Sequence, residues 1–122
     1  MGSIEKHYPV SINLLTKSRL LAVEFDDGVR FELSCEYLRV YSPSAEVQGH
    51  GPGQGVLQLG KETVNIREIE PVGNYAIKLH FDDGHDSGIY TWQYLYKLGK
   101  NHDNYWNDYL SALKQAGHER RQ

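Results

Sequence analysis

One motif occurs twice in this chain and constrains its fold more than any other feature of the sequence. Residues 25–38 and 81–95 each begin with Phe-Asp-Asp-Gly, continue through a short second segment, and end with a hydroxyl residue three positions before a Tyr-Leu pair. The Asp-Gly step supplies the positive backbone angles that a tight hairpin turn requires. The hydroxyl residue is a typical helix N-cap. We therefore predict two strand–turn–strand–helix units, which align with a single insertion.

The strands of these units are indicated by alternation of apolar and polar side chains. Residues 19–25 and 29–33 alternate around the first turn, and residues 75–81 form the clearest alternating segment before the second turn. Alternation with a period of two is the pattern of a half-buried strand. Further strands are predicted at residues 10–15, 56–59, 64–69 and 86–90.

Three helices are expected. Ser34 is placed to cap a short helix from Cys35 to about Val40, and Thr91 is placed to cap a helix to about residue 98, with Gly99 as its terminating residue. The last helix begins near residues 101–103. Its apolar residues follow helical spacing and comprise Trp106, Tyr109, Leu110 and Leu113.

Together these elements predict an α+β fold, consisting mostly of antiparallel β-hairpins with short connecting helices and a C-terminal amphipathic helix. Residues 10–117 are expected to form a single domain. A flexible tail is expected at residues 1–9 and another tail at residues 118–122.

Length and charge limit the classes of protein to which the chain can belong. Its 122 residues fit one domain, and its net charge of −3 comes without the basic stripe typical of nucleic-acid-binding proteins. No apolar run approaches the roughly 18 residues of a membrane span, and the first residues lack the apolar core of a secretory signal. A single cysteine excludes an internal disulfide and fits a reducing bacterial cytoplasm.

The aspartate pairs are the first candidate chemical groups. Asp26-Asp27 and Asp82-Asp83 could bind a metal or act as paired acids, but Asp-Gly turn chemistry accounts for both pairs equally well. We favour the turn interpretation. The two copies differ after the glycine, because His85 and Asp86 stand in the second copy where the first has Val29 and Arg30.

Histidines are the second group. Imidazole and carboxylate side chains bind zinc or iron, although no pair of histidines here has the spacing of a strong metal motif. His85 is the best metal candidate, followed by His50 and Asp86, whereas His80 lies at an outward position of its strand. The Gly-rich loop at residues 49–55 is where a site or a mobile lid is expected.

No catalytic constellation can be named from the sequence. Cys35 follows a cap residue, which could activate a thiolate, but no base can be assigned to it. It matches Trp92 in the repeat, and we therefore interpret Cys35 as a packed core residue. The Gly-rich loop lacks the Gly-Lys-Ser/Thr end of a phosphate-binding loop. An enzyme is not expected.

With these residues laid out, the chain resembles the gamma-butyrobetaine hydroxylase-like N-terminal domain family, small bacterial proteins of unknown function. The resemblance covers roughly residues 12–99. The matching motifs are Phe25-Asp26-Asp27-Gly28, residues 36–50 (Glu-Tyr-Leu-Arg-Val-Tyr-Ser-Pro-Ser-Ala-Glu-Val-Gln-Gly-His), Val64-Asn65-Ile66, residues 70–76 (Glu-Pro-Val-Gly-Asn-Tyr-Ala) and residues 81–92.

This resemblance has several implications. In the large hydroxylases the domain precedes a catalytic iron and 2-oxoglutarate domain, which would need far more chain than is present. The domain there resembles a zinc module of three cysteines and one histidine, whose positions fall near Ser42, Ser44, Val47 and His85. Three of the four ligands are therefore missing. Related domains are also fused to P-loop ATPases of iron–sulfur cluster assembly, which implies an adaptor role.

The expected function is a non-catalytic accessory or binding module that serves a metalloprotein or an iron–sulfur assembly partner in the cytoplasm. Its expected binding surface comprises Arg39, His50 and Asp86. The alternative is a metal-binding protein with zinc or iron at a His/Asp site around His85. No other cofactor is implied. A protein partner is expected, nucleic acid and membrane are not, and a homodimer is an open alternative.

Overall fold

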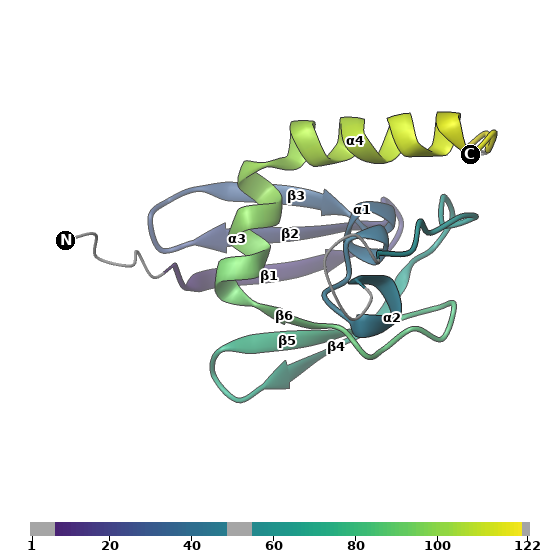
Figure 1. Cartoon of the computed structure of the whole chain (residues 1–122). Coiled ribbons are helices and arrows are strands. Elements are labelled where there is room, and N and C mark those ends of the chain that lie inside the picture. The colour runs from purple at the N-terminus through teal and green to yellow at the C-terminus, as the bar shows by residue number, and fades with distance from the viewer. Residues whose placement is uncertain (1–6, 49–54, 121–122) are drawn as a thin grey trace.

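A computed structural model describes residues 7–48 and 55–120, which form two three-stranded antiparallel sheets and four helices (Figure 1). In each sheet the strands follow one another in chain order. The strands of the first sheet are β1 (Pro9–Leu15), β2 (Leu20–Phe25) and β3 (Arg30–Ser34), and those of the second are β4 (Ile66–Val72), β5 (Ala76–Phe81) and β6 (Ile89–Thr91). The helices are α1 (Cys35–Val40), α2 (Ala45–Gln48), α3 (Trp92–Lys100) and α4 (His102–Gln115). The predicted α+β class is confirmed.

The Asp-Gly turns have the same hydrogen bonds in both halves. Asp27 Oδ1 accepts from the amide of Val29 at 3.0 Å, and Asp83 Oδ1 accepts from the amide of His85 at 3.1 Å. The following glycines have φ of 84° and 89°, in the left-handed region that favours glycine. The turn interpretation of both aspartate pairs is confirmed.

The two helices that follow the hairpins begin as predicted. The hydroxyl of Ser34 accepts from the amide of Tyr37 at 3.0 Å, and that of Thr91 accepts from the amide of Tyr94 at 3.1 Å. These hydrogen bonds satisfy amides that a helix start would otherwise leave unpaired.

The halves are joined by reciprocal hydrogen bonds. Tyr37 in α1 donates its hydroxyl to the carbonyl of Leu98 at 2.6 Å, and Tyr94 in α3 donates to the carbonyl of Tyr41 at 2.5 Å. Tyr37 and Tyr94 each lie three residues after their N-cap, and the two acceptors lie four residues further on. The same contact is therefore made in both directions, which indicates that the halves pack around a local two-fold axis.

One core fills the space between the halves. Its fully buried members come from both halves and include Leu21, Leu38, Leu79, Tyr90 and Leu95. Cys35 lies in this core with no exposed surface, and burial raises the pKa of its thiol to about 11. The interpretation of Cys35 as a packed residue is confirmed, because a thiol in this state is not a nucleophile at neutral pH.

α4 extends the domain beyond the repeat. It runs above β3 in Figure 1, and Tyr109 and Leu113 from the predicted apolar stripe are buried in a small second cluster with Val40. Glu36 in α1 accepts hydrogen bonds from the hydroxyl of Tyr109 at 2.7 Å and from Arg120 Nε at 2.8 Å. Among the described residues, no helix is both long and apolar enough to cross a bilayer.

Several boundaries differ from the sequence prediction. The predicted strand at residues 56–59 is wrong, because this segment is irregular and its apolar residues Val56 and Leu59 are exposed. β4 is shifted to residues 66–72 and includes Pro71, which it can accommodate because β4 lies at an edge of its sheet. β6 covers only Ile89–Thr91. The four-residue helix α2 was not predicted.

The terminating role predicted for Gly99 is also wrong. α3 continues through Gly99 to Lys100, and Asn101 is its C-cap. A Cβ atom at position 99 would lie 2.4 Å from Cγ of Phe31, so glycine is used here for close packing against β3.

Candidate functional site

The second Asp-Gly turn carries an ion pair in which the arginine is buried. Asp83 Oδ2 accepts from Arg39 Nε at 2.8 Å and from Lys61 Nζ at 2.7 Å. The side chain of Arg39 is only 8% exposed, so its charge depends on this partner. Burial alone would raise the pKa of Asp83, but Lys61, the amide of His85 and Arg39 together outweigh it and lower the pKa to about 2.

His85 lies beside this ion pair, with its side chain 2% exposed. Its Nε2 is 2.9 Å from the hydroxyl of Ser42, and its Nδ1 is 3.1 Å from Oε2 of Glu46. Because a carboxylate can only accept, Glu46 favours the tautomer with the proton on Nδ1, and Nε2 then accepts from the Ser42 hydroxyl. Burial lowers the pKa of His85, Arg39 lowers it further, and Glu46 and Asp83 oppose the shift.

We predict that His85 titrates below the ordinary histidine pKa of about 6.5. Because the pKa of His85 is lower in the folded state, the unfolded state binds more protons as the pH falls. The contribution of the neutral His85 to the free energy of unfolding is therefore present above the unfolded pKa and is lost as the pH falls below it. The measurement is an NMR titration of the ring carbons. In an Arg39→Met variant the titration should move to higher pH, since a nearby cation is removed. Titration of His85 above pH 6.5 in the wild type would contradict the prediction.

Further contacts fix the segment at residues 42–48 to the second hairpin. The hydroxyls of Ser44 and Ser87 are 2.7 Å apart, and Gln48 Nε2 donates to the carbonyl of Ser42 at 3.0 Å. Gly88 packs so closely against Ser42 that an added Cβ would lie 2.3 Å from its hydroxyl oxygen. We call the side chains of Arg39, Ser42, Glu46, Lys61, Asp83 and His85 the polar network.

The first half provides an internal comparison, because its turn has the same backbone but different partners. Asp27 Oδ2 accepts from the hydroxyl of Tyr96 at 2.7 Å. Tyr96 lies five residues after its N-cap, as Arg39 does in the other half. Val29 occupies the place of His85 after the glycine. The same turn is therefore built with a tyrosine and a valine in one half and with the polar network in the other.

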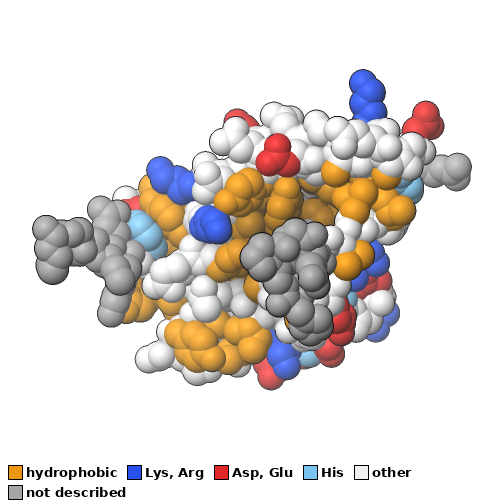
Figure 2. Space-filling model, in the orientation of Figure 1, with side chains coloured by type: hydrophobic (Ala, Val, Ile, Leu, Met, Phe, Trp, Pro, Cys, Tyr) orange, Lys and Arg blue, Asp and Glu red, His pale blue; other side chains and the backbone are white. Residues whose placement is uncertain are grey.

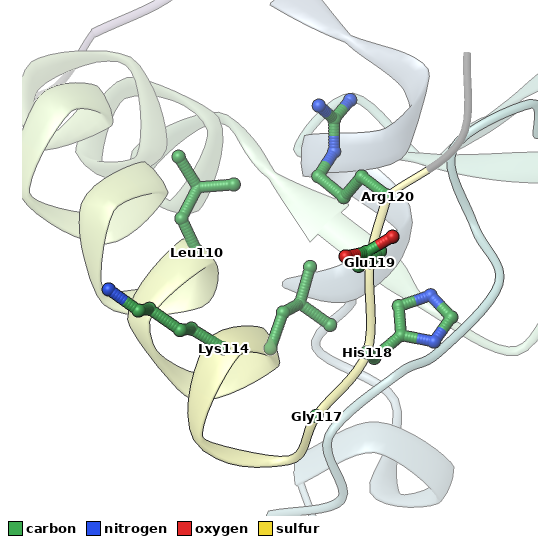
Figure 3. A pocket seen from close by; sticks show the side chains of 7 residues that line it. Leu110, Lys114, Gly117, His118, Glu119 and Arg120 are labelled. Carbon is green, nitrogen blue, oxygen red and sulfur yellow. The ribbon is translucent and has the colours of Figure 1, made fainter.

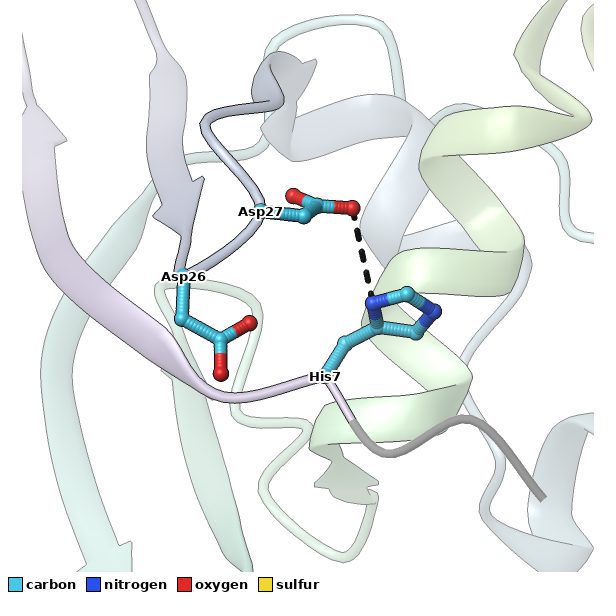
Figure 4. Close-up of side chains that lie close together, drawn as sticks. All are labelled: His7, Asp26 and Asp27. Carbon is cyan, nitrogen blue, oxygen red and sulfur yellow. Dashed lines mark ion pairs between the residues drawn. The ribbon is translucent and has the colours of Figure 1, made fainter. Parts of the chain in front are cut away.

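A histidine also approaches the first turn, but from the N-terminal segment. His7 Nδ1 lies 3.5 Å from Asp27 Oδ2 (Figure 4). The ring of His7 stacks on Tyr96 at 3.6 Å between centroids. The amide of Asp26 donates to the carbonyl of Tyr8 at 2.8 Å, and the amide of Tyr8 donates to Oδ1 of Asp26 at 3.4 Å. These contacts hold residues 7–8 against the first hairpin. The side chains gathered at the first turn therefore differ from those of the polar network at the second.

Ser42, His85 and Glu46 form the hydrogen-bond chain of a hydroxyl–histidine–carboxylate triad. This hydrogen-bond chain was not predicted from the sequence, because its three residues come from two segments about 40 residues apart. Ser42 has no exposed surface, and Gly88 closes its approach. A nucleophile needs room for the reacting carbonyl beside its oxygen, so this chain anchors residues 42–48 and has no room for a substrate.

The predicted site residues fall in two places. Arg39 and His85 meet in the polar network. Asp86 is 61% exposed and lies beside His80, with Oδ2 3.8 Å from Nδ1 of His80, and no contact places it with His85. His50 and most of the Gly-rich loop lie outside the described residues. Three members of the network were missed by sequence reasoning, namely Ser42, Glu46 and Lys61.

The zinc site implied by the resemblance can be tested against these contacts. Ser42 does lie against His85, where the resemblance placed a ligand pair. However, serine hydroxyls at 42 and 44 and the valine at 47 supply no thiolate, and both nitrogens of His85 already have hydrogen-bonding partners. These residues do not fit a zinc ion in that arrangement.

A separate hollow of about 400 Å³ lies between the end of α4 and the C-terminal residues (Figure 3). It is lined by Leu110, Leu113, Lys114 and residues 117–120. The guanidinium of Arg120 is held by the buried carboxylate of Glu36. We assign this hollow to the packing of the C-terminal residues onto α1.

The fold and the polar network define a small α+β domain made of two interlocked hairpin–helix halves, with a polar site at the second turn in which Arg39, Ser42 and His85 are buried. A family model described as gamma-butyrobetaine hydroxylase-like, N-terminal, matches residues 12–96. The chain belongs to this family, as the resemblance of its motifs predicted.

Solved structures support the assignment. One structure determined by NMR in solution is 50% identical, with a TM-score of 0.82 over 98% of this chain and 89% of that chain. A second NMR structure is 49% identical, with a TM-score of 0.81 over 93% of this chain and 90% of that one. A crystal structure from Acidithiobacillus ferrooxidans ATCC 23270, described as a protein with unknown function of the DUF971 family, is 42% identical, with a TM-score of 0.63 over 75% of this chain and 91% of that one. Among curated proteins, none matches.

Proposed function

We propose that this protein is a non-catalytic binding module whose polar network holds residues 42–48 and the second hairpin in place for a protein partner. The observation that carries the proposal is the difference between the two halves. One half completes its turn with Tyr96 and Val29, and the other uses a buried arginine, a buried histidine and a lysine at the same turn. A buried charge costs stability unless it is paired, so its use at one turn alone favours a functional role.

The surface next to the network has the character of a protein-binding surface. The amide of Val56 donates to the carbonyl of Val47 in α2 at 2.8 Å, so α2 joins the polar network to an apolar groove. The groove is lined by Tyr41, Val56, Leu57 and Tyr109, among others, and Figure 2 shows apolar side chains gathered below α4. Apolar and aromatic side chains with a polar rim are typical of a protein interface.

The charge of this surface suggests the chemistry of the partner. Glu46 is 70% exposed at its side chain, so a carboxylate borders the anchored segment. A partner with lysine or arginine at the matching positions would be favoured. The family description names the N-terminal part of a hydroxylase-like protein. The resemblance to this family implied an iron-containing hydroxylase domain and iron–sulfur assembly ATPases as neighbours, which supports a metalloprotein or iron–sulfur assembly factor as the partner class.

The test is affinity capture from an extract of the source cells with quantitative mass spectrometry. A His85→Val variant carries the residue of the equivalent turn and should lose the anchoring of residues 42–48. Glu46→Lys reverses an exposed charge and leaves the core unchanged. We expect each to reduce recovery of a metal- or cluster-containing partner about tenfold, corresponding to about 1.4 kcal/mol of binding free energy.

The control is Glu32→Gln, an exposed position on β3 in the first sheet. It should retain the partner at the wild-type level. Circular dichroism and amide NMR spectra would establish that all variants are folded. If the wild type enriches no partner, or if His85→Val and Glu46→Lys retain every partner, the proposed surface is wrong.

A further inference from the structure

Metal-ligating side chains gather on the outer face of the β4–β5 hairpin, away from the polar network. Glu68 and Glu70 are two residues apart on β4 and therefore point to the same face. His80 on β5 is the register partner of Glu68. One ligand atom from each of Glu68, Glu70 and His80 lies within 4.8 Å of the others. We propose that these three residues bind a divalent transition-metal ion of the zinc or iron(II) type.

The geometry of His80 supports this site. Its Nε2 lies 2.8 Å from Oε1 of Glu70 and 3.9 Å from Oε2 of Glu68. Zinc bonds of about 2.0–2.2 Å in a tetrahedral arrangement separate two ligand atoms by about 3.4 Å. The two observed separations bracket that value, so small side-chain rotations would bring all three atoms onto one ion.

Asp86 completes the arrangement from the other side of the ring. Its Oδ2 lies 3.8 Å from Nδ1 of His80, while Nε2 faces the two glutamates. A metal-ligating histidine usually donates its second N–H to a carboxylate, which fixes the ring and its tautomer. At 3.8 Å the two atoms are too far apart for a hydrogen bond, and a small rotation of the exposed Asp86 side chain would bring it into reach as a positioning residue for His80. In the sequence analysis, Asp86 was grouped with His85 instead.

The surroundings leave room for the ion and for further ligands. A hollow of about 390 Å³ is lined by Glu68, His80, Asp86 and their neighbours Arg67, Phe81 and Gly84. The register of β4 and β5 is irregular between Ile66 and Glu68, and such bulges re-aim side chains. Three protein ligands leave a fourth position open, which is the arrangement of a site that exchanges water or another ligand.

Positive side chains lie around the cluster. Lys78 is the register partner of Glu70, and Arg67 lines the hollow beside Glu68 and His80. Lys78 and Arg67 also compete with an ion for the carboxylates. This competition favours a transition-metal ion that uses the imidazole nitrogen over magnesium or calcium, which prefer oxygen ligands.

A second cluster, of His7, Asp26 and Asp27, is less suited to a metal ion. Both oxygens of Asp27 accept hydrogen bonds, from the amide of Val29 and from the hydroxyl of Tyr96. His7 stacks on Tyr96, and its Nδ1 pairs with Asp27 (Figure 4). These groups are already used to hold the first turn, so the β4–β5 face is the better site.

The test is isothermal titration of the untagged full chain with zinc chloride, with cobalt(II) absorption as a report on the ligands. We expect one ion per chain. His80→Gln and Glu70→Gln should abolish binding or weaken it by at least about 100-fold, and Asp86→Asn by about 10-fold, the range for a carboxylate that orients a ligating histidine. All of these positions are on the surface, so folding should be retained and can be checked by circular dichroism.

Two matched controls remove a histidine elsewhere. His102→Gln removes an exposed histidine that lies 3.2 Å from Asp103 in α4, and His7→Gln removes the histidine of the other cluster. Both should bind zinc as the wild type does. The proposal is overturned if the wild type binds less than about a tenth of an equivalent, or if His80→Gln binds as tightly as the wild type. Partner capture by the polar network does not depend on these residues, so the two proposals can fail separately.

Discussion

An Asp83→Asn substitution is expected to lower the free energy of unfolding by about 3 kcal/mol, the usual scale for removing one partner of a buried ion pair. Asparagine keeps the size of the side chain and an oxygen that can accept from the amide of His85. It cannot neutralise Arg39, whose side chain is 8% exposed, or Lys61. The loss is therefore electrostatic. Urea denaturation followed by circular dichroism measures it.

The equivalent turn supplies the matched control for this prediction. Asp27→Asn changes the same turn position where the partners are the hydroxyl of Tyr96 and the ring of His7. Neither is a buried permanent cation, so the loss should be clearly smaller than at Asp83. In an Arg39→Met background the Asp83→Asn substitution should cost much less, because the stranded charge is gone. Equal losses at the two turns would show that the ion pair adds nothing to the turn itself.

The same ion pair predicts how the protein responds to acid. The folded pKa of Asp83 is about 2, below the unfolded value of 3.8, so the unfolded state binds more protons between these values. The ionised Asp83 therefore adds to the free energy of unfolding above about pH 4, and this addition is lost as the pH falls toward 2. It amounts to about 1–2 kcal/mol once solvent screening is allowed for. Asp83→Asn should remove this part of the acid sensitivity.

The repeated motif was sufficient to predict the main elements of the fold. Local chemistry decides them, since Asp-Gly fixes the turn, a hydroxyl residue caps the helix, and alternation identifies the strand. The reciprocal hydrogen bonds of Tyr37 and Tyr94 could not be predicted, because they depend on how the halves pack. α2 was missed for a different reason, as four residues carry no helical periodicity and lie just after Pro43.

The candidate site was predicted in part for similar reasons. His85 stood out because its counterpart in the repeat is Val29, and comparison within the chain reveals such a difference. Arg39 corresponds to Tyr96 in the same way. Glu46 and Lys61 lie outside the repeated motif, and hydroxyl and charged residues such as Ser42 are ordinary in connecting segments. Their role depends on tertiary contacts with the second hairpin.

The two close contacts between the halves each use a glycine, but on opposite sides of the contact. Counted from the N-caps Ser34 and Thr91, Phe31 corresponds to Gly88, and Ser42 corresponds to Gly99. In one contact the glycine is on the helix and meets the ring of Phe31, and in the other the glycine is on the strand side and meets Ser42. Each close contact thus requires one glycine. Its partner is a bulky ring in the first contact and a polar hydroxyl in the second. This exchange is what creates space for the buried Ser42–His85 contact in the second half.

A Gly99→Ala substitution tests this packing directly and sets two known effects against each other. Within a helix, alanine is favoured over glycine by about 1 kcal/mol, so helix propensity alone predicts a more stable protein. The added Cβ, however, would lie 2.4–2.6 Å from three ring atoms of Phe31. Overpacking of this kind costs about 1–3 kcal/mol. We expect the packing cost to exceed the gain and the free energy of unfolding to fall by about 1–2 kcal/mol.

A second substitution separates the two effects. In a Phe31→Leu background the shorter side chain leaves space near position 99, so adding Gly99→Ala should cost nothing or stabilise the protein by up to about 1 kcal/mol. The four variants form a double-mutant cycle, measured by urea denaturation, whose coupling term should be at least about 1 kcal/mol. If Gly99→Ala stabilises the protein in the wild-type background, Phe31 yields freely and position 99 has no packing requirement. A loss that persists unchanged with Phe31→Leu would locate the strain in α3 itself, outside the contact between the halves.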